Sequence, residues 1–122
     1  MKAAPLGKIY KNGEMIVRQG DEGNCMYVVQ TGKVEVIKEE RDQQISLGVL
    51  GKGEFFGEMA LFERESRSAT VLAQGEARIL TIDKRTLLRR IQEDPTLAFQ
   101  LLEKLSQRIR ELNAKLIRAT TR

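Results

Sequence analysis

Short runs in which apolar and polar residues alternate fill the chain from Glu14 to about Ile82. Segments such as KVEVIKE and ARILTID place an apolar residue at every second position, which is the period of a half-buried β-strand. Glycines and polar residues interrupt these runs about every 8 to 12 residues, a spacing typical of antiparallel sandwiches, jelly rolls and barrels. The pattern predicts a mainly β, many-stranded antiparallel structure over residues of about 10–82.

The apolar period changes after Asp83, a residue suited to cap a helix. The segment KRTLLRRIQED predicts a short helix over about 84–93, and Pro95 is suited to open a second helix over about 95–118. Because 122 residues suffice for one ordinary hydrophobic core, we expect a single domain over residues 1–122.

The second predicted helix carries a heptad pattern, which we call the seam. Its apolar residues follow one another at spacings of 3, 4, 3 and 4: Leu102, Leu105, Ile109, Leu112 and Leu116. The helix would be roughly 40 Å long, longer than a small β-roll can cover, so we expect the seam to form a homodimer. Arg108 and Lys115 fall at g positions, where an antiparallel pair would oppose like charges, and this favours a parallel pair. The alternative is a helix that lies on its own β-structure.

Composition restricts the class of protein. Hydrophobic residues make up 41% and charged residues 31% of the chain, which is typical of a globular protein, and no apolar run approaches the ~18 residues of a membrane span. A single cysteine, Cys25, can build no disulfide framework, and the N-terminus has no apolar stretch of signal-peptide length. We therefore expect a cytoplasmic protein in which Cys25 is a small core residue.

The chain contains no histidine, the commonest general base near neutral pH and the commonest metal ligand. This excludes His-dependent triads and the metal site of a cupin-type metalloenzyme on a jelly roll. Since no other feature indicates catalysis, we expect no enzymatic activity and no metal cofactor.

The net charge of +4 lies in the C-terminal segment. Residues 96–122 contain six Lys and Arg residues against two Glu residues, whereas residues 1–95 contain fifteen basic and fifteen acidic residues. A basic tail can bind nucleic acid or an anionic surface. We favour the simpler interpretation, the solvated face of a helix.

The stretch FGEMALFERESRSATV, residues 56–71, interrupts the β pattern. GEMALF is long enough for one helical turn, whose N–H groups would attract an anion. Arg67, at the start of the next strand, could hold two phosphate oxygens with its planar guanidinium. Glu58 suits this site only if the ligand also offers hydroxyl donors, as a ribose does. The residues alone leave open a second interpretation, in which Glu58 and Arg67 form a structural ion pair.

These residues resemble the phosphate-binding cassette of the cyclic nucleotide-binding domain family, which includes catabolite-activator-like proteins and regulatory subunits of protein kinase A. The family pattern is F-G-E-[LM]-A-L, five variable residues and R-[AST]-A-T-V, and the match is gapless. Upstream, NGEMIVRQGDEGNCMYVVQTGKVEVIKE resembles the opening strands of the family. The resemblance covers residues of about 10–118. It implies an eight-stranded antiparallel β-roll, or jelly roll, with C-terminal helices, the last a long dimerisation-type helix.

The resemblance also implies a ligand, a cyclic purine nucleotide, and a set of residues that bind it. Glu58 would accept a hydrogen bond from the ribose 2′-hydroxyl, and Arg67 would neutralise the cyclic phosphate. The backbone of the cassette helix would approach the phosphate, a serine would lie near phosphate or base, and an asparagine on the last helix is a candidate for contact with adenine. The expected ligand-binding residues are Gly57, Glu58, Met59, Ala60, Arg67, Ser68 and Asn113.

The function implied is that of a regulatory sensor domain, which binds 3′,5′-cyclic AMP and transmits its occupancy through the C-terminal helices. The alternatives are a cyclic GMP sensor and a ligand-independent dimerisation or interaction module of the same fold. Bacterial transcription factors of the family continue into a winged helix-turn-helix, for which the chain leaves no room after LIRATTR. We therefore expect no DNA-binding domain in this chain and no membrane partner.

Overall fold

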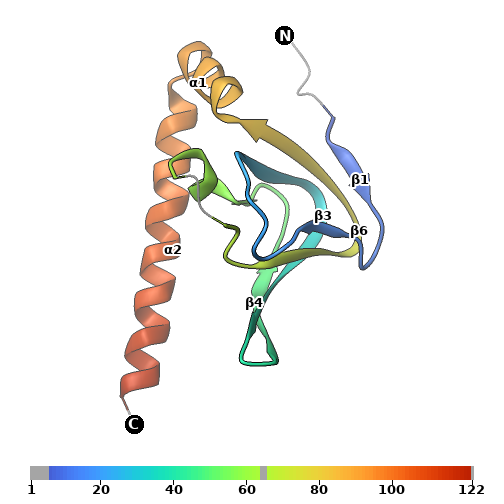
Figure 1. Cartoon of the computed structure of the whole chain (residues 1–122). Coiled ribbons are helices and arrows are strands. Elements are labelled where there is room, and N and C mark those ends of the chain that lie inside the picture. The colour runs from blue at the N-terminus through green and yellow to red at the C-terminus, as the bar shows by residue number, and fades with distance from the viewer. Residues whose placement is uncertain (1–5, 64–65, 122) are drawn as a thin grey trace. The chain divides into compact units, whose positions relative to one another are not determined.

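The computed structural model of the protein describes residues 6–63 and 66–121 (Figure 1). The chain divides into two compact units, Met1–Lys84 and Arg85–Arg122. The first contains the β-structure and is called the β-unit below, and the second contains most of the helical structure and is called the helical unit. The expectation of one domain over residues 1–122 stays a prediction.

The β-unit is an antiparallel sheet that contains six strands within the described residues. The sheet has the order β1-β6-β3-β4, and the short strands β2 and β5 pair with β6 and β3. A single 3₁₀ turn, η1 (Glu58–Leu61), follows β5 and is called the cassette helix below. The strands are β1 (Lys8–Tyr10), β2 (Met15–Val17), β3 (Cys25–Glu40), β4 (Gln43–Leu50), β5 (Phe55–Phe56) and β6 (Thr70–Asp83).

The expected class, a mainly β antiparallel roll with C-terminal helices, is confirmed, but the expected count of eight strands is wrong. The 16 residues of β3 and the 14 residues of β6 each run through two of the predicted strands (Figure 1). The glycines predicted to end those strands, Gly32 and Gly75, instead have positive φ angles of 81° and 74°. Because glycine tolerates positive φ, each strand bends there and shifts its register without ending.

The core of the β-unit is formed mainly by residues of the two long strands, which pair with each other. Val29 and Val34 of β3 pack with Val71 and Ile79 of β6, and Phe56 of β5 joins the same cluster. These side chains come from the apolar positions of the alternating pattern, as expected for strands with one buried face, whereas β4 is exposed at every position before Leu50. Because Phe56 is buried in this cluster, it also fixes the position of the chain immediately before the cassette helix.

The helical unit contains α2 (Thr96–Thr120), which follows α1 (Lys84–Glu93) after a short break at Asp94 and Pro95. The Asp94 carboxylate accepts a hydrogen bond from the backbone N–H of Thr96 at 3.2 Å, and Pro95 occupies the N-cap position of α2. The bounds of α1 agree with those expected, and α2 begins and ends within two residues of the predicted 95–118. Among the residues that the structure describes, no helix is both long and apolar enough to cross a membrane.

Candidate functional site

A pocket of about 210 Å³ lies where the cassette helix meets the start of β6. Six of the seven expected ligand-binding residues line it together, and their role in binding stays a prediction. The seventh, Asn113, lies on α2 in the helical unit. The residues that line the pocket are Gly57, Glu58, Met59, Ala60, Ser66, Arg67 and Ser68.

Gly57 sets the direction of the cassette helix. It occupies the N-cap position of η1 with φ 76°, a left-handed conformation that glycine adopts at low cost. A Cβ atom at this position would lie 2.6 Å from Nη1 of Arg67, so a larger residue would displace the guanidinium. Within this short turn the N–H of Ala60 donates to the carbonyl of Gly57 at 3.3 Å, whereas the N–H of Met59 precedes that first bond and belongs to a residue that lines the pocket.

Arg67 is the one charged side chain that is buried among the described residues, with 9% of its surface exposed. Its Nη1 donates a hydrogen bond to the carbonyl of Gly57 at 2.9 Å, and its Nη2 donates to the carbonyl of Cys25 at 2.8 Å. These carbonyls orient the guanidinium but carry no charge. A buried cation held by neutral groups is favourably placed to receive an anion.

The loop between β2 and β3 closes around Arg67. The backbone N–H of Arg67 donates to the carbonyl of Asp21 at 2.7 Å, and its carbonyl accepts from the N–H of Gly20 at 2.9 Å. Gly23 leaves room for the side chain, because a Cβ atom there would lie 2.1 Å from Nε of Arg67. The position of the guanidinium is therefore determined by a segment more than 40 residues earlier in the sequence.

An aromatic pair lies beside the guanidinium. The rings of Tyr27 and Phe56 stack with centroids 5.1 Å apart and planes at 17°, and the guanidinium carbon of Arg67 is 5.5 Å from the Tyr27 centroid. Burial, followed by a hydrogen bond with Cys25, raises the pKa of the Tyr27 phenol to about 12.

Sequence reasoning missed several residues of this site. Ser66 lines the pocket but falls among the five variable positions of the cassette pattern, which carry no expectation. Gly23 and Cys25 support Arg67 through contacts that no local pattern reveals, and the GDEGN turn was the one available signal. Arg64 and Glu65 of the variable stretch lie outside the described residues.

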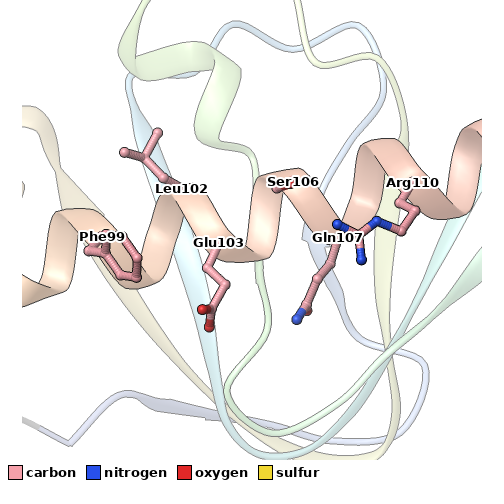
Figure 2. Close-up of a pocket in the computed structure, with 6 residues that line it drawn as sticks. All are labelled: Phe99, Leu102, Glu103, Ser106, Gln107 and Arg110. Carbon is pink, nitrogen blue, oxygen red and sulfur yellow. The ribbon is translucent and has the colours of Figure 1, made fainter.

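A second cavity, of about 420 Å³, is an open groove along one face of α2 (Figure 2). Figure 2 shows Glu103 and Gln107 projecting to the same side of the helix and Leu102 to the opposite side. Leu102 is the one member of the predicted seam that lines the groove. All the lining residues belong to α2: Phe99, Leu102, Glu103, Ser106, Gln107 and Arg110.

The predicted seam is largely exposed to solvent. Four of its members are 60% to 64% exposed, whereas Leu105 is half-buried. Leucine and isoleucine side chains in a row on one helix form an apolar stripe of the kind that marks an interaction surface. The four exposed members are Leu102, Ile109, Leu112 and Leu116.

The described residues include no group of three or more His, Cys, Asp or Glu residues that could hold a metal ion. The candidate chemistry of the pocket is therefore that of an arginine, a glutamate, two serine hydroxyls and backbone N–H groups. Together these groups can bind an anion that also carries hydroxyl donors.

Comparison with known proteins agrees with this geometry. The model of the family described as cyclic nucleotide-binding domain matches residues 8–94. The cyclic AMP receptor protein of Thermus thermophilus is 34% identical over 110 residues, which are 89% of this chain and 51% of that protein. The cGMP-dependent protein kinase egl-4 of Caenorhabditis elegans is 34% identical over 107 residues, which are 84% of this chain and 14% of the kinase.

The fold has a counterpart among solved structures. The crystal structure of the Thermus thermophilus catabolite activator protein matches with a TM-score of 0.79 and 33% identity, over 93% of this chain and 54% of that chain. The chain thus spans about half the length, or less, of these three proteins.

Proposed function

Because this chain belongs to the cyclic nucleotide-binding domain family, we propose that its β-unit binds 3′,5′-cyclic AMP in the pocket of the cassette. The observation that carries the proposal is the buried guanidinium of Arg67, which lies beside the first turn of η1 and whose Nη atoms donate to neutral carbonyls. A cyclic phosphate would supply the negative charge that suits both groups.

Each lining residue has a part in this proposal. Arg67 neutralises the phosphate, and the backbone N–H groups of Met59 and Ala60 donate to its oxygens, that of Ala60 sharing its long 3.3 Å hydrogen bond to the Gly57 carbonyl. Glu58 accepts the hydrogen bond of the ribose 2′-hydroxyl, and the left-handed Gly57 lets the backbone approach the sugar. Ser68 lies near the phosphate or the base. The domain catalyses no reaction in this proposal, because none of these roles requires bond cleavage.

The choice of base needs residues beyond this pocket. Its 210 Å³ and the arginine, glutamate and serine side chains in its lining suit the sugar and the phosphate, which are common to both cyclic purine nucleotides. Similarity to a cyclic AMP receptor supports adenine, and similarity to a cGMP-dependent kinase keeps cyclic GMP as the alternative. Asn113 is our candidate for the adenine contact, since its amide can both donate and accept.

Isothermal titration with cyclic AMP tests the proposed ligand, and competition with cyclic GMP tests the base. We expect the chain to bind cyclic AMP, and cyclic GMP to displace it only at higher concentration. Displacement by cyclic GMP at an equal or lower concentration would reverse the assignment of the base. A folded chain that binds neither nucleotide would instead support the rival function, a ligand-independent interaction module.

Replacing Glu58 by glutamine tests its proposed contact with the ribose. Glutamine keeps the shape of glutamate but is a weaker acceptor, so we expect an affinity loss of about fivefold. We expect the unmodified chain to bind the 2′-deoxy analogue more weakly than cyclic AMP. The variant should bind the two ligands with similar affinities. Titration of both ligands measures this. Glu63→Gln, an exposed acid outside the pocket, is the control. If the Glu58→Gln variant prefers cyclic AMP over the 2′-deoxy analogue by the same factor as the unmodified chain, Glu58 does not contact the ribose hydroxyl.

Binding would be transmitted as a shift in population. A ligand changes the arrangement of the C-terminal helices only by the difference between its affinities for the alternative arrangements. We further propose that the seam on α2 pairs two copies in parallel, and that the protein works in the cytoplasm. The exposed apolar stripe supports the pairing, and the single cysteine supports the location.

A further inference from the structure

Tyr27 contacts Arg67 but does not line the pocket. The guanidinium carbon of Arg67 is 5.5 Å from the centroid of the Tyr27 ring, within the range of a cation–π interaction. Within residues 6–63 and 66–121, the pocket is lined only by residues of 57–60 and 66–68. Tyr27 can therefore influence a ligand in this pocket only through the groups that it holds, of which Arg67 carries the charge.

The Tyr27 ring is itself held in place. On one side of β3, Tyr27 pairs with Phe56 of β5 and stacks on its ring, and on the other side it pairs with Thr81 of β6. The side chain is half-buried and packs against the core cluster of the β-unit. A ring fixed by two neighbouring strands and an aromatic neighbour provides a rigid surface for a guanidinium.

The same ring also contacts the start of the cassette helix. Gly57 follows Phe56 directly, and a Cβ atom on Gly57 would lie 3.3 Å from Cδ2 of Tyr27 and 2.6 Å from Nη1 of Arg67. The carbonyl of Gly57 accepts the hydrogen bond of Nη1. Tyr27, Gly57 and Arg67 therefore meet at one point, where the helix and the guanidinium converge.

We propose that Tyr27 is a positioning residue for anion binding: its ring face holds the Arg67 guanidinium against Gly57, so that the arginine and the η1 N–H groups engage one phosphate together. This inference rests on the proposed function. A phenol is neutral at physiological pH, and the burial of Tyr27 shifts its pKa further in the same direction, so Tyr27 acts through its ring and not as a phenolate. A ring without the hydroxyl keeps the contact with the guanidinium and loses only the hydrogen bond with Cys25, so it should retain most of the positioning effect.

A double-mutant cycle with Arg67 tests the proposal, with cyclic AMP as the titrated probe. We expect Tyr27→Leu to raise the Kd roughly 5- to 30-fold, the worth of a partly desolvated cation–π contact. Tyr27→Phe keeps the ring and should change the Kd less than about threefold. In an Arg67→Ala background, Tyr27→Leu should change the Kd less than about twofold, because the group through which it acts is gone.

Tyr10→Leu is the matched control, since Tyr10 is also half-buried against the same core but lies outside the pocket. It should leave the Kd unchanged. Melting followed by circular dichroism identifies variants that fail to fold. An equal loss of affinity from Tyr27→Leu with and without Arg67, or a loss from Tyr27→Phe as large as that from Tyr27→Leu, would overturn the proposal.

A second readout does not require nucleotide binding. The Arg67 Nε–H resonance, observed by ¹⁵N NMR of the free protein, should be shielded by the ring, move in Tyr27→Leu and keep its position in Tyr27→Phe. A resonance that does not move in Tyr27→Leu would overturn the positioning role, whatever the nucleotide does. Failure of the unmodified chain to bind cyclic AMP would overturn the proposed function instead, so the two failures are distinguishable.

Discussion

Replacing Arg67 by alanine is expected to weaken the binding of cyclic AMP by roughly 30-fold or more. Removing one member of a close, partly desolvated charge pair costs on the order of 2 to 5 kcal/mol, because the remaining charge loses its best partner. The burial of Arg67 and the hydrogen bonds to Gly57 and Cys25 make this the largest single effect that we expect on binding. Isothermal titration measures it.

The same substitution will also lower stability, by about 1 to 3 kcal/mol, since it removes a donor from the part-buried carbonyls of Cys25 and Gly57, of which Gly57 keeps only the longer bond from the N–H of Ala60. Arg78→Ala provides a control, because Nη1 of Arg78 also donates to a part-buried carbonyl, that of Gly7 at 3.2 Å, outside the pocket. Arg78→Ala should lower the melting temperature and leave the affinity unchanged. An Arg67→Ala protein that is folded and binds cyclic AMP as well as the unmodified chain would leave Arg67 with a structural role only.

Replacing Leu112 by aspartate is expected to convert a dimer into a monomer. In a paired seam, the carboxylate would be buried against an apolar neighbour, at a cost of about 3 kcal/mol or more, which corresponds to a dissociation constant raised more than 100-fold. Sedimentation of the unmodified chain at tens of micromolar should show a dimer, and the variant should sediment as a monomer.

Ile117→Asp is the matched control for this test. Ile117 is as exposed as Leu112, at 63%, and lies on the same helix but outside the heptad positions of the seam. It should leave the dimer intact. If Ile117→Asp dissociates the dimer and Leu112→Asp does not, the two copies pair through a face of α2 other than the seam. If the unmodified chain is a monomer both with and without nucleotide, the proposed dimer is wrong.

The helices and the cassette were predictable because their signals are local. The bounds of α1 follow from an apolar period that changes after Asp83 and stops before Pro95. Six of the seven expected binding residues lie in one pocket because they belong to two short segments, each of which is close in sequence. A pattern that is contiguous in the chain stays contiguous in space.

The strand count was not predictable in the same way. Gly32 and Gly75 have the composition of turns that end strands, and each lies inside a strand. Glycine at positive φ is compatible with a tight turn and with a bend in a continuing strand. Only the hydrogen bonds to neighbouring strands distinguish the two, and those partners are distant in sequence.

The sequence by itself determined the fold class, the extents of the helices and the identity of the cassette, because hydrophobic period, capping residues and a gapless motif are properties of neighbouring residues. The tertiary structure alone decided how the cassette arginine is held. The carbonyl of Cys25, the space left by Gly23 and the ring of Tyr27 reach Arg67 across some 40 residues of chain. Such contacts depend on the register of β3 against β5 and β6, which forms only when the strands pair, and no local pattern encodes it.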